Sequence, residues 1–172
     1  MASLIGSKVE RKEDKKFLTG KGRYTADINL AHQTYAYFVR SPHARAKINN
    51  VDISKALKAS GVIKIFTGED ISREKIGGLI AGWKIVSQDG KDMKVPNHPP
   101  LAKDVVNYVG DHVAVVIAES LEEARNAAEL VSVSYNIQKA VVNTGDAMKS
   151  EAIHEGIDNN LCFDFILGDK SK

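Results

Sequence analysis

The chain has 172 residues, of which 43% are hydrophobic and 27% charged, proportions that are ordinary for one globular domain able to bury its own core. Its formal net charge is only +2, so there is no large field of one sign that would attract nucleic acid or anionic lipid. The single cysteine, Cys162, excludes an intrachain disulfide framework and a thiolate-rich metal or iron–sulfur site within this chain.

The sequence also bears on where the protein works. No stretch has the length and apolarity of a membrane span, and the N-terminal residues 1–16 contain no apolar core of signal-peptide length. Together with the single cysteine, this predicts a cytoplasmic protein with no membrane span and no nucleic-acid partner.

The N-terminal part predicts an arm followed by two strands. Residues 1–27 are rich in charges and end in glycine-containing turns, as expected of an extended arm. Residues 33–40 are aromatic and β-branched, which predicts a strand that ends where Pro42 interrupts it. Residues 46–52 predict a second strand.

A short helix, a third strand and a long loop are predicted next. Ser54 can cap a helix over residues 55–60, and Gly61 supplies the left-handed residue that often follows a helix end. Residues 62–66 alternate between apolar and basic side chains, as a strand does. Residues 72–100 are rich in glycine and proline, which predicts a long loop carrying a short hairpin.

A strand–helix–strand unit follows. Residues 112–118 form an apolar run typical of a strand buried on both faces. Ser120 and Glu123 have the spacing of a capping box, in which each side chain satisfies an amide of the first helical turn. Residues 131–135 alternate strictly and predict the returning strand. The apolar face of the helix between them is formed by Leu121, Ala124, Ala127, Ala128 and Val131.

The C-terminal part predicts one more strand, over residues 161–167. It has no obvious partner in the sequence, so it either joins the domain's own sheet or begins something that another chain completes. Cys162 is expected to be a buried, inert thiol of this strand rather than a nucleophile.

No catalytic, cofactor-binding or metal-binding residue is identified. The five histidines lack the short spacing of metal sites, and residues 154–158 lack the second histidine that a zincin helix needs. Residues 20–22 contain two glycines but neither the third glycine nor the preceding strand of a dinucleotide-binding loop. No serine has the surroundings of a hydrolase nucleophile.

Two features are candidates for contact with a partner. The turn that follows the strand 33–40 can present His43 and Arg45 to a partner or pocket, or its polar groups can simply satisfy the local backbone. Trp83, the only tryptophan, is either an interface anchor or a side chain that fills a gap in the core.

Seven segments, in order along nearly the whole chain, resemble one known family. They are RKED at 11–14, FLTGKGRY at 17–24, FVRSPHARAKI at 38–48, TGEDI at 67–71, PLA at 100–102, YVGDHVAVV at 108–116 and VSVSY at 131–135. They resemble the N-terminal domain of the large, molybdenum-carrying subunit of the xanthine dehydrogenase, aldehyde oxidase and aerobic carbon monoxide dehydrogenase family.

The resemblance implies a fold and a complex. The fold is the α/β hammerhead, an α+β arrangement with a mixed sheet and two main helices, over residues 1–157 including the arm. Residues 158–172 then resemble the start of the link into a molybdenum-binding domain. The assembled family enzyme holds a molybdopterin-type molybdenum cofactor, FAD and [2Fe-2S] clusters, and the residues that bind the metal lie in later domains, so none is carried over to this chain.

The sequence therefore predicts a non-catalytic structural or interface component of a molybdenum hydroxylase. Its partners would be the molybdenum-binding chain and the flavin and iron–sulfur subunits. A separate polypeptide supplying the molybdenum domains, a piece of a longer chain, and a relic without a partner all remain open, as does a stand-alone binding module that has lost the enzyme. The residues predicted to form the interface are Arg40, Ser41, Pro42, His43, Arg45, Trp83, Phe163 and Phe165.

Overall fold

The computed structural model describes residues 5–168, and the chain divides into two compact units, Met1–Gln33 and Thr34–Lys172. The first unit contains a short helix α1 (Asp14–Leu18) and a 3₁₀ turn η1 (Thr25–Asp27). None of its described residues is buried. The arm was predicted to be extended; in the structure a helical turn with i,i+3 ion pairs interrupts it.

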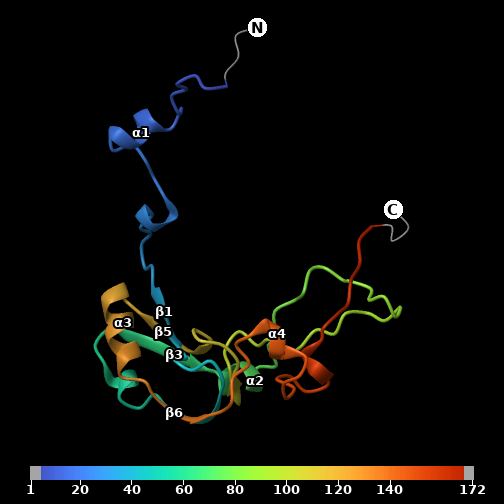
Figure 1. Cartoon of the computed structure of the whole chain (residues 1–172). Coiled ribbons are helices and arrows are strands. Elements are labelled where there is room, and N and C mark those ends of the chain that lie inside the picture. The colour runs from blue at the N-terminus through green and yellow to red at the C-terminus, as the bar shows by residue number, and fades with distance from the viewer. Residues whose placement is uncertain (1–4, 169–172) are drawn as a thin grey trace. The chain divides into compact units, whose positions relative to one another are not determined.

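The second unit contains two antiparallel sheets of three strands each (Figure 1). In the first sheet, β5 (His112–Ala118) lies between β1 (Tyr35–Arg40) and β3 (Val62–Thr67). The central position of β5 explains its apolar run, because both of its edges are paired and its side chains are covered. Four of its side chains are completely buried: Val113, Ala114, Val116 and Ala118.

In the second sheet, β2 (Ala46–Asp52) lies between β4 (Val105–Val106) and β6 (Ser132–Ile137). Its core cluster includes Ala46 and Val106, both fully buried. Val113 of β5 belongs to the same cluster. The two sheets are therefore joined through a shared apolar contact.

Helix α3 (Leu121–Glu129) packs on the first sheet (Figure 1). Its buried face consists of Ala124, Ala127 and Ala128. Ala127 and Ala128 belong to a core cluster that also includes Ile65 and Val116. Because alanine is short, the helix axis can approach the sheet closely, and the contact leaves no space for a larger side chain.

The start of α3 is capped by Ser120 as the sequence predicts, but the reciprocal half of the predicted capping box is not formed, because the Glu123 carboxylate accepts from hydroxyl groups instead of the Ser120 amide. The Ser120 hydroxyl accepts the amide N–H of Glu123 at 3.2 Å and donates to a Glu123 carboxylate oxygen at 2.8 Å.

We expect Ser120→Ala to lower the free energy of unfolding by about 1 kcal/mol, because the first turn loses its side-chain acceptor. Urea unfolding measures the change. Ser134→Ala, at an exposed position of β6, should change it by less than about 0.5 kcal/mol, and equal losses in the two variants would contradict the capping role.

The α+β class and the hammerhead fold are confirmed, but two details differ. The pairing of the described strands is antiparallel throughout rather than mixed. Of the two predicted helices, residues 55–60 form only a 3₁₀ turn, η2 (Ala56–Lys58). The reason is that Gly61 and β3 follow at once, while the Ser54 amide donates to the Asp52 carboxylate.

The longest of the helices that were not predicted is α2 (Gly68–Arg73). Its signal is present in the sequence as a capping box, in which the Thr67 amide donates to the Asp70 carboxylate at 2.8 Å. A four-residue helix α4 (Thr144–Ala147) and a 3₁₀ turn η3 (Asp158–Asn160) complete the described elements. The predicted division between residues 157 and 158 stays a prediction, and residues 169–172 of that link lie outside the described residues.

Candidate functional site

The turn after β1 is held by the Ser41 hydroxyl and by main-chain hydrogen bonds to the turn before β5. Ser41 is 2% exposed, and its hydroxyl accepts the His43 amide at 3.0 Å and donates to the His43 carbonyl at 3.1 Å. The Ser41 amide donates to the Asp111 carbonyl, and the Ser41 carbonyl accepts from the Gly110 amide, both at 2.8 Å. For Ser41 this supports the second interpretation of the turn, in which polar groups satisfy the local backbone.

The other residues of this turn are placed around it. The Arg40 guanidinium donates to the Gly110 carbonyl at 3.2 Å, and that of Arg45 lies 3.5 Å from the Ala152 carbonyl. The His43 ring meets Tyr135 edge-on, with 4.9 Å between centroids. Pro42 is exposed. The structure brings the predicted turn residues together, and their contact with a partner stays a prediction.

Trp83 lies in the long loop, which contains the predicted hairpin as a single bridge between Val86 and Asp92. Trp83 is 78% exposed, so in this chain it does not fill a gap in the core. It borders a groove of about 420 Å³ whose apolar wall includes Leu79, Ile80 and Val95. All three are more than half exposed, at 62%, 93% and 53%.

The predicted strand at residues 161–167 is not formed. Two main-chain hydrogen bonds tie it to the hairpin, from the Lys94 amide to the Cys162 carbonyl and from the Gln88 amide to the Asp164 carbonyl, each 2.9 Å long. A strand needs a continuous ladder, which an apolar sequence alone cannot supply. Phe163 and Phe165 are 41% and 52% exposed, and Cys162 is only partly buried, so the prediction of a buried thiol is wrong.

A cavity of about 870 Å³ lies beside α2, lined also by the loop before β4, by the turn before β5 and by residues 153–155. Its most buried charged group is Asp111, at 6% exposure. One carboxylate oxygen of Asp111 accepts the Asn107 amide at 3.1 Å. Sequence reasoning gave these residues no role, although the Gly110-Asp111 turn between two strands was a usable signal.

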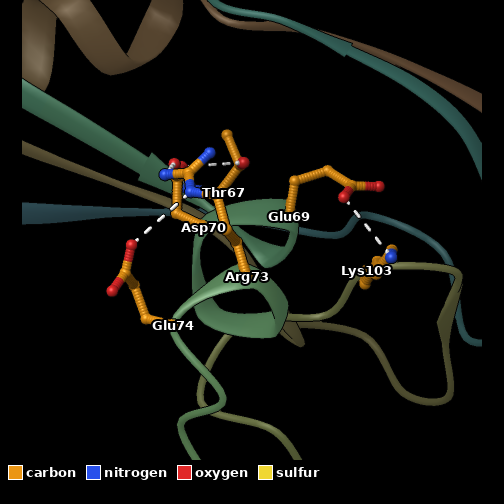
Figure 2. A network of polar contacts seen from close by, with 6 residues as sticks. All are labelled: Thr67, Glu69, Asp70, Arg73, Glu74 and Lys103. Carbon is orange, nitrogen blue, oxygen red and sulfur yellow. Dashed lines mark hydrogen bonds and ion pairs between the residues drawn. The ribbon is translucent and has the colours of Figure 1, made fainter.

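Helix α2 presents charged side chains beside this cavity, and Figure 2 shows the network that orders them. Arg73 is 2.6 Å from an Asp70 carboxylate oxygen and 3.5 Å from that of Glu74. The amide of Thr67 and, to a smaller degree, the side chains of Arg73 and Thr67 hold the pKa of Asp70 below its usual value. Lys103 pairs with Glu69 at 3.3 Å.

Two histidines near the cavity and the turn have lowered pKa values. Burial lowers the pKa of His112, which stacks on Phe38 with 4.4 Å between centroids, and the Arg40 charge lowers it further. Burial lowers the pKa of His154, followed by the charges of Arg45 and His98. Both imidazoles are therefore held in the neutral form to a lower pH than in the unfolded chain.

This arrangement predicts a loss of stability at mildly acidic pH. The unfolded state takes up protons first near pH 6.5, so the contribution of the neutral histidines is present above that pH and is lost as the pH falls through their folded pKa values. Asp52 and Asp70, whose pKa values are lowered from 3.8, lose their contribution only at lower pH.

We therefore expect urea unfolding to give a lower free energy at pH 5.5 than at pH 7.5, and His112→Gln to reduce that difference. His32→Gln, at an exposed position of the arm, should leave the difference as it is in the wild type. If neither His112→Gln nor His154→Gln reduces the difference in the free energy of unfolding between the two pH values, that difference arises from other groups.

Among residues 5–168, no group of three or more His, Cys, Asp or Glu side chains is placed to hold a metal ion. Within the same range, no helix has the length and apolarity needed to cross a membrane.

The two joined sheets with α3 on one of them define a small α+β domain of the hammerhead type. The chain belongs to the aldehyde oxidase and xanthine dehydrogenase family, because residues 19–139 match the model of that family's a/b hammerhead domain. Its relatives are large subunits of molybdenum hydroxylases, which are oxidoreductases, so the resemblance stated from the sequence motifs is confirmed.

Three comparisons illustrate the match. The chain is 36% identical, over 154 residues, to the nicotine 6-hydroxylase large subunit of Paenarthrobacter nicotinovorans, covering 90% of this chain and 18% of that one. It superposes on quinoline 2-oxidoreductase from Pseudomonas putida 86 with a TM-score of 0.73 and 35% identity, covering 86% and 18%. With the Cu,Mo-CO dehydrogenase the TM-score is 0.66 and the identity 32%, covering 83% and 17%. The chain thus spans less than a fifth of the length of these relatives.

Proposed function

We propose that this chain is a non-catalytic interface component of a molybdenum hydroxylase, which docks on the polypeptide that carries the molybdopterin site. In the assembled complex that polypeptide would hold the molybdenum cofactor, and further subunits would hold FAD and [2Fe-2S] clusters. The complex would work in the cytoplasm. The proposal assigns docking, and no chemical step, to the residues of this chain.

The observation that carries the proposal is the concentration of exposed apolar side chains in the segments outside the two sheets. In the arm, Leu18 is 86% exposed and Leu30 is 70% exposed. In the loop and the C-terminal segment, Ile80 is 93% and Leu167 is 89% exposed. Exposed apolar side chains in such segments favour contact with another protein, because water is released when they are covered.

The predicted interface residues fit this picture to different degrees. Trp83, Phe163 and Phe165 carry aromatic surface that is available for contact, which is the type of side chain enriched at the centres of interfaces. In the turn, Arg40, Pro42, His43 and Arg45 supply the more polar contacts of the proposed interface. Ser41 contributes by holding the turn in shape rather than by touching a partner.

A pull-down from the native cell extract, with this chain as bait, tests the proposal. Mass spectrometry identifies the captured proteins, and a molybdenum assay tests whether the metal comes with them. We expect a molybdenum protein that lacks a hammerhead domain of its own. Capture of a protein of another class, with no molybdenum, would instead support a stand-alone binding module.

A further inference from the structure

The cavity beside α2 is distinct from the exposed apolar segments and has the properties of a binding site. Its volume is about 870 Å³, which lies within the range of protein ligand pockets. Ile71 and Leu101 give it apolar wall, while Tyr108 and Asp111 give it polar groups. A mixed lining of this kind binds a side chain that has both an apolar stem and a polar end.

Asp111 supplies the charge of the site. It is 6% exposed, the Asn107 amide donates to one of its carboxylate oxygens, and the Tyr108 side chain also hydrogen-bonds to it. It takes part in none of the ion pairs between described residues. A carboxylate in such surroundings is poorly hydrated, so a cation placed against it gains more than it would at the surface.

The remaining charges of the lining also favour a cation. Asp104 and Glu155 are exposed carboxylates of the lining, and its lysines are Lys75 and Lys103. Lys103 is already paired with Glu69 at 3.3 Å (Figure 2). The lining therefore contains three carboxylates, whereas only one of its lysines has no ion pair among the described residues. This excess of negative charge favours the binding of a cation.

An aromatic pair borders the same carboxylate. The rings of His98 and Tyr108 meet edge-on, with 5.9 Å between centroids, and the His98 Nε2 lies 3.2 Å from the Tyr108 hydroxyl. Partial burial and then the negative charge of Asp111 raise the pKa of Tyr108, which keeps the phenol neutral. An aromatic ring beside a carboxylate can stack on a flat cation that the carboxylate binds.

We propose that this cavity receives an arginine side chain of the molybdenum-bearing polypeptide, with its guanidinium on Asp111 and its stem along Ile71 and Leu101. The proposal rests on the proposed function, since it names the group by which that partner is recognised. Arginine fits better than lysine because its guanidinium is planar, has five N–H donors and stacks on aromatic rings. The partner is taken as the source because the proposed function docks this chain on that polypeptide, and a buried carboxylate is complementary in charge to an arginine.

The cavity is tested first with a small probe. The full chain, labelled with ¹⁵N, is titrated with N-acetyl-arginine methylamide, and the amide shifts of residues 98–111 are followed by NMR. N-acetyl-citrulline methylamide has nearly the same shape without the charge. We expect saturable shifts with arginine and about tenfold weaker binding of citrulline, because a neutral hydrogen bond replaces a charge-assisted one. Equal binding of both probes, or no saturable shift, would overturn the proposal.

Variants locate the binding. Asp111→Asn keeps an oxygen to accept the Asn107 amide and removes the charge, so we expect about tenfold weaker arginine binding at an unchanged melting temperature. If Asp111→Asn lowers the melting temperature, Glu155→Gln at the exposed side of the lining replaces it, with a loss of about threefold. Glu122→Gln, at an exposed position of α3, is the control. Undiminished arginine binding in both lining variants would contradict the assignment.

The pull-down separates this inference from the proposed function. If wild-type chain and Asp111→Asn capture the molybdenum protein equally well, the docking proposal stands and the arginine site is wrong. If the wild type captures it and Asp111→Asn captures much less, both are supported. If the wild type binds the arginine probe but captures no molybdenum protein, the cavity takes a free cationic molecule, and the partner's arginine is excluded as its occupant.

Discussion

Replacement of Ala127 by leucine is expected to lower the free energy of unfolding by about 3 kcal/mol. Ala127 is fully buried between α3 and the first sheet. The three additional carbon atoms must push the helix away from β5 or force side chains out of their preferred rotamers, and overpacking of this kind typically costs about 1–3 kcal/mol. The upper end applies here because the neighbouring contacts, at Ala114 and Ala128, are also made by short side chains.

Urea unfolding of Ala127→Leu and of Arg125→Leu measures this effect with a matched control. Arg125 lies two residues earlier on the same helix and is exposed, so the same new side chain there should change the free energy of unfolding by less than about 0.5 kcal/mol. A loss in Ala127→Leu as small as in the control would mean that α3 does not sit closely on the sheet.

The strands could be predicted because their signals are local. Residues 112–118 were predicted as a strand covered on both faces and form β5 with those bounds, and residues 46–52 form β2 as predicted. The Ser120 cap likewise involves residues three positions apart. In each case the hydrophobic period or the turn chemistry of a few neighbouring residues decides the local structure.

The errors in the predicted elements had different causes. Residues 161–167 have strand composition, but the hairpin against which they lie offers them only two main-chain hydrogen bonds. Residues 55–60 have helical composition, but the entry into β3 limits them to a 3₁₀ turn. The α2 helix had a local signal at Thr67 and Asp70, yet the glycine between them favoured a turn in the sequence reading.

Some features of the candidate sites could be found from the sequence, and others could not. The turn at Ser41 and the exposure of Trp83 concern single residues, and the sequence could at least single them out. The cavity could not be found, because it joins α2, the loop before β4, the turn at Asp111 and residues 153–155. The cavity depends on the packing of four segments that are far apart in the chain. Hydrophobic periodicity predicts the structure of single segments and does not predict which distant segments pack together.

Replacement of Trp83 by alanine is expected to weaken docking on the molybdenum-bearing polypeptide by at least about 30-fold, which corresponds to about 2 kcal/mol. Trp83 is the largest side chain of the loop surface and is 78% exposed. It stands beside a groove of about 420 Å³, so a partner that covers the groove must also cover the indole. Loss of a buried indole from an interface removes more apolar contact than loss of any other side chain.

The same exposure separates an interface role from a structural one. Since Trp83 contributes little to the core of this chain, Trp83→Ala should change its free energy of unfolding by less than about 0.5 kcal/mol. Binding of immobilised wild-type and variant chains to the captured polypeptide gives the affinities, with Leu121→Ala as the control because Leu121 is a 54% exposed apolar residue of α3. Unchanged affinity in Trp83→Ala would mean that the loop is not part of the interface. A large loss of stability would mean that Trp83 packs in the core of this chain.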